Sequence, residues 1–125
     1  AESLLTVRGK VEWIGDEALM DAVTAVSGSG PAYVFLLAEC LAAAGIEAGL
    51  EEGLAMRLAR ETVAGAGELL YRADEPAATL RENVTSPGGT TAAALQVLMA
   101  PDTGLGPLME KAVAAAKKRG RDLAG

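Results

Sequence analysis

The sequence predicts an all-α helical bundle, and three observations favour this fold class. Half of the residues are hydrophobic but only 3% are aromatic, so small side chains must fill the space between closely packed helices. Apolar residues recur at helical spacing, as at Leu19, Val23 and Val26. Glycine and proline lie between these segments, at positions where short connections between helices are expected. At 125 residues the chain is long enough for one domain with its own core.

The first 14 residues have a different pattern from the rest. We interpret Ala1 to Val7 as the tail of a helix ended by Gly9, and the alternating residues 11–14 as a short strand. A single strand has no partner within a helical chain. We therefore expect residues 1–15 to be the remnant of a neighbouring domain, or a strand that pairs between chains, and residues 16–125 to form the helical domain.

Helix signals divide the rest of the chain. Gly15 and Asp16 cap the first helix, and Pro31 suits the first position of the second, with Ser29 or Gly30 as its cap. The expected helices are 17–26, 32–44 (ended by Gly45), 51–72, 74–83, 92–99 and 107–123. The expected packing faces are Leu54, Leu58, Thr62 and Leu69 on the third helix, and Leu108, Ala112, Ala115 and Ala116 on the last. Gly65 and Gly67 each weaken a helix by about 1 kcal/mol, which favours close approach of another helix, within the chain or between subunits.

Composition limits the classes of function. A net charge of −6 argues against a general nucleic-acid surface, and the cations at 117–121 are better explained as stabilising a helix C-terminus. One cysteine, Cys40, excludes an internal disulfide and fits a reducing cytoplasm, and no secretory signal opens the chain. Because histidine is absent, histidine triads and histidine metal sites are excluded, and no metal is expected.

The mean hydropathy of +0.25 is high for a soluble domain. The most apolar stretch, 31–45, contains Glu39 and is shorter than the roughly 20 residues that a membrane span needs. We therefore expect a buried helix and no membrane partner. The surplus of apolar surface indicates that another subunit covers part of it.

Residues 81–91 form the strongest candidate for a binding site. A helical segment ends at Pro87, two glycines follow, and a new apolar segment begins. Glycine lets the backbone approach a ligand, and a helix start presents unpaired amides with partial positive charge. The turn is therefore a candidate anion site, although an ordinary capped interhelical turn has the same pattern. A second turn at 27–31 has weaker support. The chain has no activated nucleophile and no dinucleotide fingerprint.

Two motifs then identify a resemblance. Residues 21–33 (DAVTAVSGSGPAY) and 80–91 (LRENVTSPGGTT) strongly resemble pyrroline-5-carboxylate reductase, the last enzyme of proline biosynthesis, in order and separation. The resemblance covers essentially the whole chain. It implies a helical dimerisation domain of the 6-phosphogluconate dehydrogenase C-terminal type, and a homodimer that in some members assembles further. It also implies that residues 1–15 end a Rossmann domain absent from this chain, so the chain alone is expected to be inactive.

The resemblance also assigns roles to residues. Thr91 corresponds to the threonine whose hydroxyl binds the imine nitrogen of the substrate. The amides around Gly88, Gly89 and Thr90, with Ser86 nearby, would hold the substrate carboxylate. NADPH or NADH would bind mainly to the absent domain. Glu17 and Asn83 correspond to family positions that lie near the cofactor, and Pro31 corresponds to a position that lines the mouth of the active site.

Two other functions remain open. The chain could be a non-catalytic helical dimerisation module, because an intact turn does not show that a partner domain exists. It could also belong to a hydroxyacid-type dehydrogenase, but these generally use a catalytic lysine within a helical segment. The lysines here, Lys10, Lys111, Lys117 and Lys118, have no comparable setting.

Overall fold

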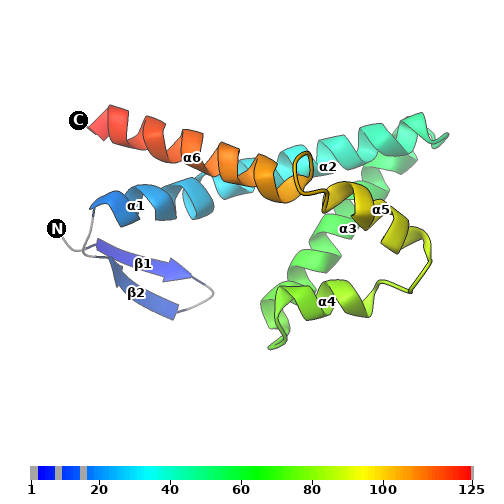
Figure 1. Cartoon of the computed structure of the whole chain (residues 1–125), viewed down its shortest axis with the longest axis horizontal. Helices are drawn as coiled ribbons and strands as arrows, with labels where there is room; N and C mark the ends of the chain where they lie inside the picture. The colour runs from blue at the N-terminus through cyan, green and yellow to red at the C-terminus, as the bar shows by residue number, and fades with distance from the viewer. Residues whose placement is uncertain (1–2, 8–9, 15–16, 125) are drawn as a thin grey trace. The chain divides into compact units, whose positions relative to one another are not determined.

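The computed structural model describes residues 3–7, 10–14 and 17–124 (Figure 1), with side chains from residue 17 onward. Helices dominate, as the sequence predicts. The chain divides into two compact units, one made of residues 1–28 and 75–125 and the other of residues 29–74. The two units are described separately below. The predicted domain boundary near residue 15 lies outside the described residues and stays a prediction.

The N-terminal segment is a β-hairpin. Strand β1 (Ser3–Val7) pairs antiparallel with β2 (Lys10–Ile14), so that Ser3 lies opposite Ile14 and Val7 opposite Lys10. The predicted strand at 11–14 is confirmed, but the helix tail predicted at 1–7 is wrong for the described residues of that range. Sequence reasoning treated the strand as unpaired because the preceding five residues lack clear alternation. An isolated hairpin is marginal by itself, and β2 contacts helix α1.

Helix α1 (Glu17–Val23) continues directly into η1 (Thr24–Gly28), a single π-helical segment. The predicted helix is confirmed in position, while its predicted cap at residues 15 and 16 lies outside the described residues. The sharp break predicted at 27–31 is wrong, because only Ser29 separates η1 from the next helix. The Ser27 hydroxyl donates a hydrogen bond to the Val23 carbonyl (2.9 Å), which holds this segment in a helical path.

Helix α6 (Leu105–Ala124) packs along α1 and η1 in the first unit. Ala25 of η1 is almost fully buried, at 1% exposed. Gly120 allows close approach, because a Cβ there would lie 3.5 Å from the Asp21 carboxylate. The helix begins two residues before Pro107, where the Leu108 amide donates to the Gly104 carbonyl (3.3 Å).

The face of α6 that packs inward differs from the predicted one. Leu108 is 63% exposed, and Ala112 and Ala115 are also exposed, so their predicted inward packing is wrong within this chain. Ala116 is half-buried, as is Val113. The difference arises because small residues let α6 approach α1 closely. Leu108, the bulkiest residue of the predicted set, lies on a different face of the helix.

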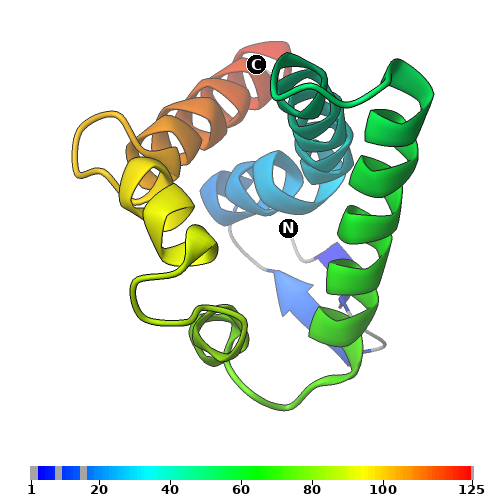
Figure 2. The same ribbon diagram turned by 90° about the vertical axis from the view of Figure 1, so that its right-hand side faces the viewer.

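Helices α2 (Gly30–Glu47) and α3 (Glu52–Arg72) pack against each other and form the second unit (Figure 2). Ser29 is the N-cap of α2, as predicted, although its side chain makes no capping hydrogen bond. Helix α3 matches its prediction to within one residue, and its N-cap Glu51 accepts a hydrogen bond from the Gly53 amide.

The predicted end of α2 at Gly45 is wrong. The helix continues to Glu47 and ends at Gly49, whose φ of 114° is a left-handed conformation that favours glycine. The amide of Leu50 donates to the Gly45 carbonyl (3.0 Å), which closes the last turn. Gly45 leaves room for the residue after this turn, because a Cβ there would lie 3.2 Å from the Leu50 Cδ1.

Alanines form the contact between α2 and α3. Ala42, Ala55 and Ala59 are each at most 3% exposed and make up one cluster. The leucines of the predicted α3 face are 38–53% exposed, so this face does not pack within its own unit, and its contact with another subunit stays a prediction. Alanines bring two helices closer than leucines can, and the leucines are left on the outer surface. A single copy of the unit therefore leaves a large apolar surface uncovered.

Exposed apolar side chains extend along both helices of this unit. On α2 and α3 they include Val34, Phe35, Leu36, Leu37, Leu41, Leu54, Met56, Leu58, Leu69 and Leu70. A Cβ added at Gly65 or Gly67 would meet nothing within 4 Å, so within the described residues 29–74 of this unit no other helix approaches them closely. The alternative, a contact between subunits at these glycines, stays a prediction.

The helical run Glu17–Glu47 is 31 residues long and, by length and composition alone, could cross a membrane. The prediction that the apolar stretch is too short is therefore wrong, because the helix passes Gly45 and follows η1 with hardly a break. Apolar helices at the core of soluble proteins meet the same criterion. Membrane binding is thus neither required nor excluded by this helix.

Gly49→Ala should destabilise the chain by about 1–3 kcal/mol, because alanine is strained at φ 114°. Gly106→Ala is the matched control: Gly106 lies inside α6 with nothing within 4 Å of an added Cβ. That control should be neutral or stabilising. Urea unfolding at one fixed protein concentration measures both changes. Equal effects of the two substitutions would contradict the role given to Gly49.

Candidate functional site

The candidate site lies in the first unit, between helices α4 (Ala77–Asn83) and α5 (Thr90–Leu98). Both helices match their predicted positions closely. Figure 2 shows the chain passing from α4 to α5 through an extended connection of residues 84–89. Only these six residues separate the C-terminal end of α4 from the N-terminal end of α5.

Residues 86–89 form a type II β-turn. The Gly89 amide donates to the Ser86 carbonyl (3.0 Å), Pro87 occupies the second position, and Gly88 has a φ of 73° at the third. Type II turns favour proline and glycine at these two positions. Gly89 is also required by space, because a Cβ there would lie 3.2 Å from the Ser86 carbonyl oxygen. The sequence Ser-Pro-Gly-Gly thus specifies this conformation locally.

The turn delivers Gly89 as the N-cap of α5. Within the described residues no side chain caps this helix start. The amides of Thr90, Thr91 and Ala92 therefore have no acceptor inside the helix, and they carry the positive end of its dipole. Such a group of amides can bind a carboxylate or another small anion. The predicted pattern of helix end, glycine turn and helix start is confirmed, while binding itself remains a prediction.

The hydroxyl groups of the segment fall into two kinds. The Thr91 side chain is half-buried and Ser86 is exposed, and neither hydroxyl forms a hydrogen bond with the described residues of the chain. By contrast, the Thr85 hydroxyl donates to the Arg81 carbonyl at 2.6 Å. A hydroxyl in the first turn of a helix has no carbonyl one turn earlier to bond with, and Thr91 is therefore available to a ligand.

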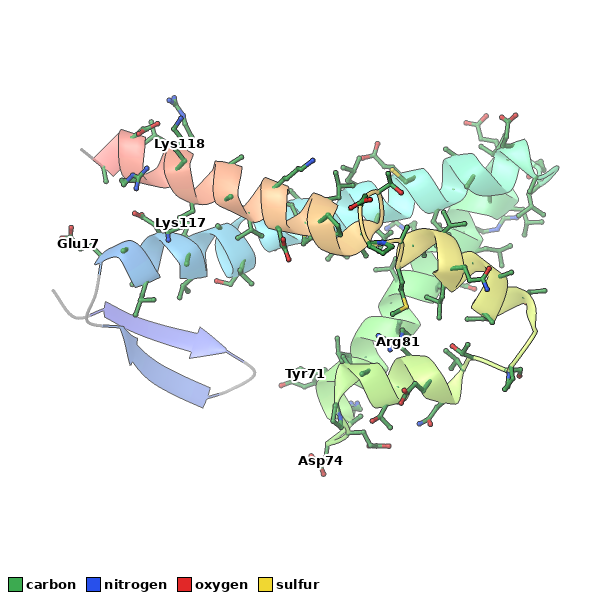
Figure 3. All side chains as sticks on the ribbon, in the orientation of Figure 1. Glu17, Tyr71, Asp74, Arg81, Lys117 and Lys118 are labelled. Carbon is green, nitrogen blue, oxygen red and sulfur yellow. The ribbon has the colours of Figure 1, made fainter. Side chains whose placement is uncertain are left out.

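Thr85 is the residue of this segment whose contacts were not predicted. Its amide donates to the Glu82 carbonyl (3.0 Å), in addition to the hydroxyl bond to Arg81. Figure 3 shows Arg81 on α4, the helix whose last carbonyls these bonds engage. The sequence signal was a threonine directly after a helix end, a position where a hydroxyl commonly bonds to the backbone of the preceding turn.

The residues predicted near a cofactor lie on three different elements. Asn83 ends α4 and is exposed, next to the turn. Glu17 is the first residue of α1, and Figure 3 shows it at the N-terminal end of that helix. The packing partners of α1 are β2, η1 and α6, so Glu17 is positioned by different contacts from the turn. Pro31 is exposed in the first turn of α2 and belongs to the other unit.

No other strong candidate site is found among residues 17–124. These residues contain no group of three acidic or cysteine side chains suited to a metal ion. An open depression between α2 and α3 is lined by mixed side chains, including Glu39, Ile46 and Met56. Its polar groups do not converge on one point in a way that would define a ligand.

Comparison with known proteins identifies the family. Residues 17–123 match the family described as "Pyrroline-5-carboxylate reductase dimerisation". The chain belongs to this family. The resemblance seen in the two sequence motifs is thereby confirmed, and so is the expectation of a helical dimerisation fold.

Curated relatives agree with this assignment. Pyrroline-5-carboxylate reductase of Pseudomonas aeruginosa is 45% identical over 124 residues, which cover 99% of this chain and 45% of the relative. The enzyme of Synechocystis is 45% identical over 123 residues, covering 98% of this chain and 45% of the relative. The chain thus spans less than half the length of these relatives.

Solved structures show the same fold. The chain superposes on pyrroline-5-carboxylate reductase of Coxiella burnetii with a TM-score of 0.81 at 39% identity, covering 88% of this chain and 40% of that chain. For the Plasmodium falciparum enzyme, solved with NADP bound, the TM-score is 0.79 at 36% identity, covering 89% and 42%. The chain thus covers most of its own length but less than half of each of these solved chains.

Gly88→Ala should destabilise the chain by about 1–2 kcal/mol, because alanine disfavours the left-handed conformation at this turn position. Gly88→Asn should cost less, since asparagine tolerates that conformation in type II turns. Urea unfolding and the amide resonances of Thr90 and Thr91 report the change. The type II assignment would be wrong if alanine and asparagine had the same effect.

Proposed function

We propose that this chain is the substrate-binding and dimerisation part of a pyrroline-5-carboxylate reductase, which reduces 1-pyrroline-5-carboxylate to L-proline with NADPH or NADH. The observation that carries the proposal is the uncapped start of α5 behind a type II turn, in a chain of this family. The turn and helix start offer amides and hydroxyls, which suit the binding of a small imino acid.

The substrate carboxylate binds at the start of α5 in this proposal. The amides at the start of α5, beginning with that of Thr90, and the Ser86 hydroxyl donate hydrogen bonds to it, and the helix dipole favours its negative charge. The Gly89 amide instead donates to the Ser86 carbonyl and holds the turn in place. The Gly88 backbone lies open, with nothing within 4 Å of an added Cβ. An anion can therefore approach the backbone without meeting a side chain of this chain.

Thr91 orients the reacting group. Its hydroxyl lies one residue into α5 and bonds to the imine nitrogen, while the carboxylate is held by the amides at the start of α5. These two attachment points fix the plane of the five-membered ring and direct one face of the C=N carbon away from the protein. The reduced nicotinamide supplies the hydride when bound. A proton on nitrogen completes the conversion of C=N to CH–NH, so the overall reaction consumes one hydride and one proton.

The contribution of this chain to cofactor binding is peripheral. Asn83 and Glu17 offer exposed polar groups at helix ends, and Pro31 offers an apolar ring. These groups fit contacts to a nucleotide that is held elsewhere, because the chain contains no glycine fingerprint for the pyrophosphate. Catalysis then depends on orientation and electrostatic stabilisation, for which the absence of histidine is no obstacle.

Thr91→Ala should lower kcat/KM for pyrroline-5-carboxylate by about tenfold to a hundredfold in the reductase that contains this chain, because a hydrogen bond to a charged group is lost. Thr91→Ser keeps the hydroxyl and should restore most of the activity. Steady-state rates of NADPH oxidation measure both. If Thr91→Ala retained wild-type kcat/KM, the hydroxyl would have no role at the imine.

We also propose that the chain acts as a homodimer through the apolar surface of α2 and α3. The alanine contact between the two helices leaves Phe35 at 68% and Leu36 at 57% exposed. Exposure of this extent is unfavourable in water, and a second copy that covers it restores a normal core. The family description names dimerisation, which supports this occupant. A non-catalytic dimerisation module would use the same surface.

The wild-type chain should scatter light as twice its mass of 12.7 kDa at micromolar concentration. Phe35→Glu should weaken the dimer by more than about tenfold, because a buried unpaired carboxylate is costly. Lys118→Glu places the same side chain at an exposed position on α6 and should leave the dimer intact. A monomeric wild-type chain would refute this proposal but would leave the role of Thr91 to be tested separately.

A further inference from the structure

The end of α4 directly precedes the segment that leads to the proposed site. The last carbonyls of a helix carry the negative end of its dipole. Only residues 84–89 separate this negative end from the amides of α5, where the substrate carboxylate is proposed to bind. These carbonyl oxygens need hydrogen-bond donors, and the connecting segment is the part of the chain that directly follows them.

Thr85 satisfies two of these carbonyls. Its hydroxyl donates to the Arg81 carbonyl at 2.6 Å, and its amide donates to the Glu82 carbonyl at 3.0 Å. The Val84 amide also donates to Arg81, at a longer 3.3 Å. The hydroxyl bond is therefore the shortest link between the end of α4 and the connecting segment.

The same residue fixes where the turn begins. Thr85 is half-buried and directly precedes Ser86, whose carbonyl closes the type II turn by accepting from Gly89. With two bonds back to α4, Thr85 can neither rotate nor shift without breaking one of them. The orientation of the turn, and hence of the α5 amides, therefore follows from the position of Thr85 on α4.

We infer that Thr85 is a positioning residue for recognition of the substrate carboxylate: its hydroxyl and its amide anchor the turn that leads into α5 to the last turn of α4. Thr85 does not touch the substrate, and acts through Ser86 and the amides at the start of α5. The inference rests on the proposed function, because it assigns Thr85 a role only if a carboxylate binds there.

Removing the hydroxyl should weaken carboxylate recognition specifically. Thr85→Val keeps the branched shape of the side chain and deletes the donor, whereas Thr85→Ser keeps the donor. The informative quantity is the ratio of kcat/KM for 1-pyrroline-5-carboxylate to kcat/KM for 1-pyrroline, which has the same ring without the carboxylate. A general loss of stability lowers both rates and leaves this ratio unchanged.

The experiment measures this ratio in the reductase that contains the chain, with NADPH as the second substrate. Thr85→Val should lower the ratio by about tenfold, which is the size of effect expected when one hydrogen bond that orients the site is lost. Thr85→Ser should keep the ratio within about twofold of wild type, and the KM for NADPH should stay unchanged in both variants.

Thr62→Val is the matched control. The Thr62 hydroxyl donates to the Leu58 carbonyl at 2.6 Å, the same kind of bond at the same length, but within α3 and with no turn after it. This substitution should leave the ratio at its wild-type value. A wild-type ratio in Thr85→Val, or an equal loss in Thr85→Ser, would overturn the inference. A wild-type enzyme that does not reduce pyrroline-5-carboxylate would instead overturn the proposed function.

Discussion

The hydrogen bond from the Gly89 amide to the Ser86 carbonyl is the constraint on which the candidate site depends. It closes a turn in the six-residue connection between α4 and α5. On one side of this connection lie the last carbonyls of α4, and on the other lie the first amides of α5. Proline and glycine at the two central positions make this conformation a local property of the sequence. The site therefore needs no long-range contact to acquire its shape, although its position does depend on α4.

A second constraint comes from the size of the residues between helices. Alanines form the whole buried cluster of the α2–α3 unit, and they allow the two helices to approach closely. A cluster of this size removes little apolar surface from water, so the unit depends on burying its leucines and Phe35 elsewhere. The proposed binding site at residues 84–92 and the proposed assembly surface on α2 and α3 thus belong to different units of the chain.

Sequence reasoning was reliable where the signal was local. The end of α4 at Asn83, and the glycine turn followed by a new helix, follow from capping and turn preferences that act over a few residues. It failed where a decision required a partner distant in sequence. Residues 3–7 have ambiguous local preference and become a strand by pairing with 10–14. Gly45 also resembles a helix end, but α2 continues to Glu47, and the left-handed residue that follows its end is Gly49.

By itself the sequence determined the helical fold class, the family and the local form of the candidate turn, because periodicity, motif order and turn chemistry are written in neighbouring residues. Tertiary structure alone decided which helix faces are buried. Leucine spacing marks the apolar face of α3, yet alanines occupy the face that packs on α2, since close helix packing selects small residues when the larger ones remain available for another surface. The burial of Ala42, Ala55 and Ala59 depends on how two helices meet, which residues close in sequence do not specify.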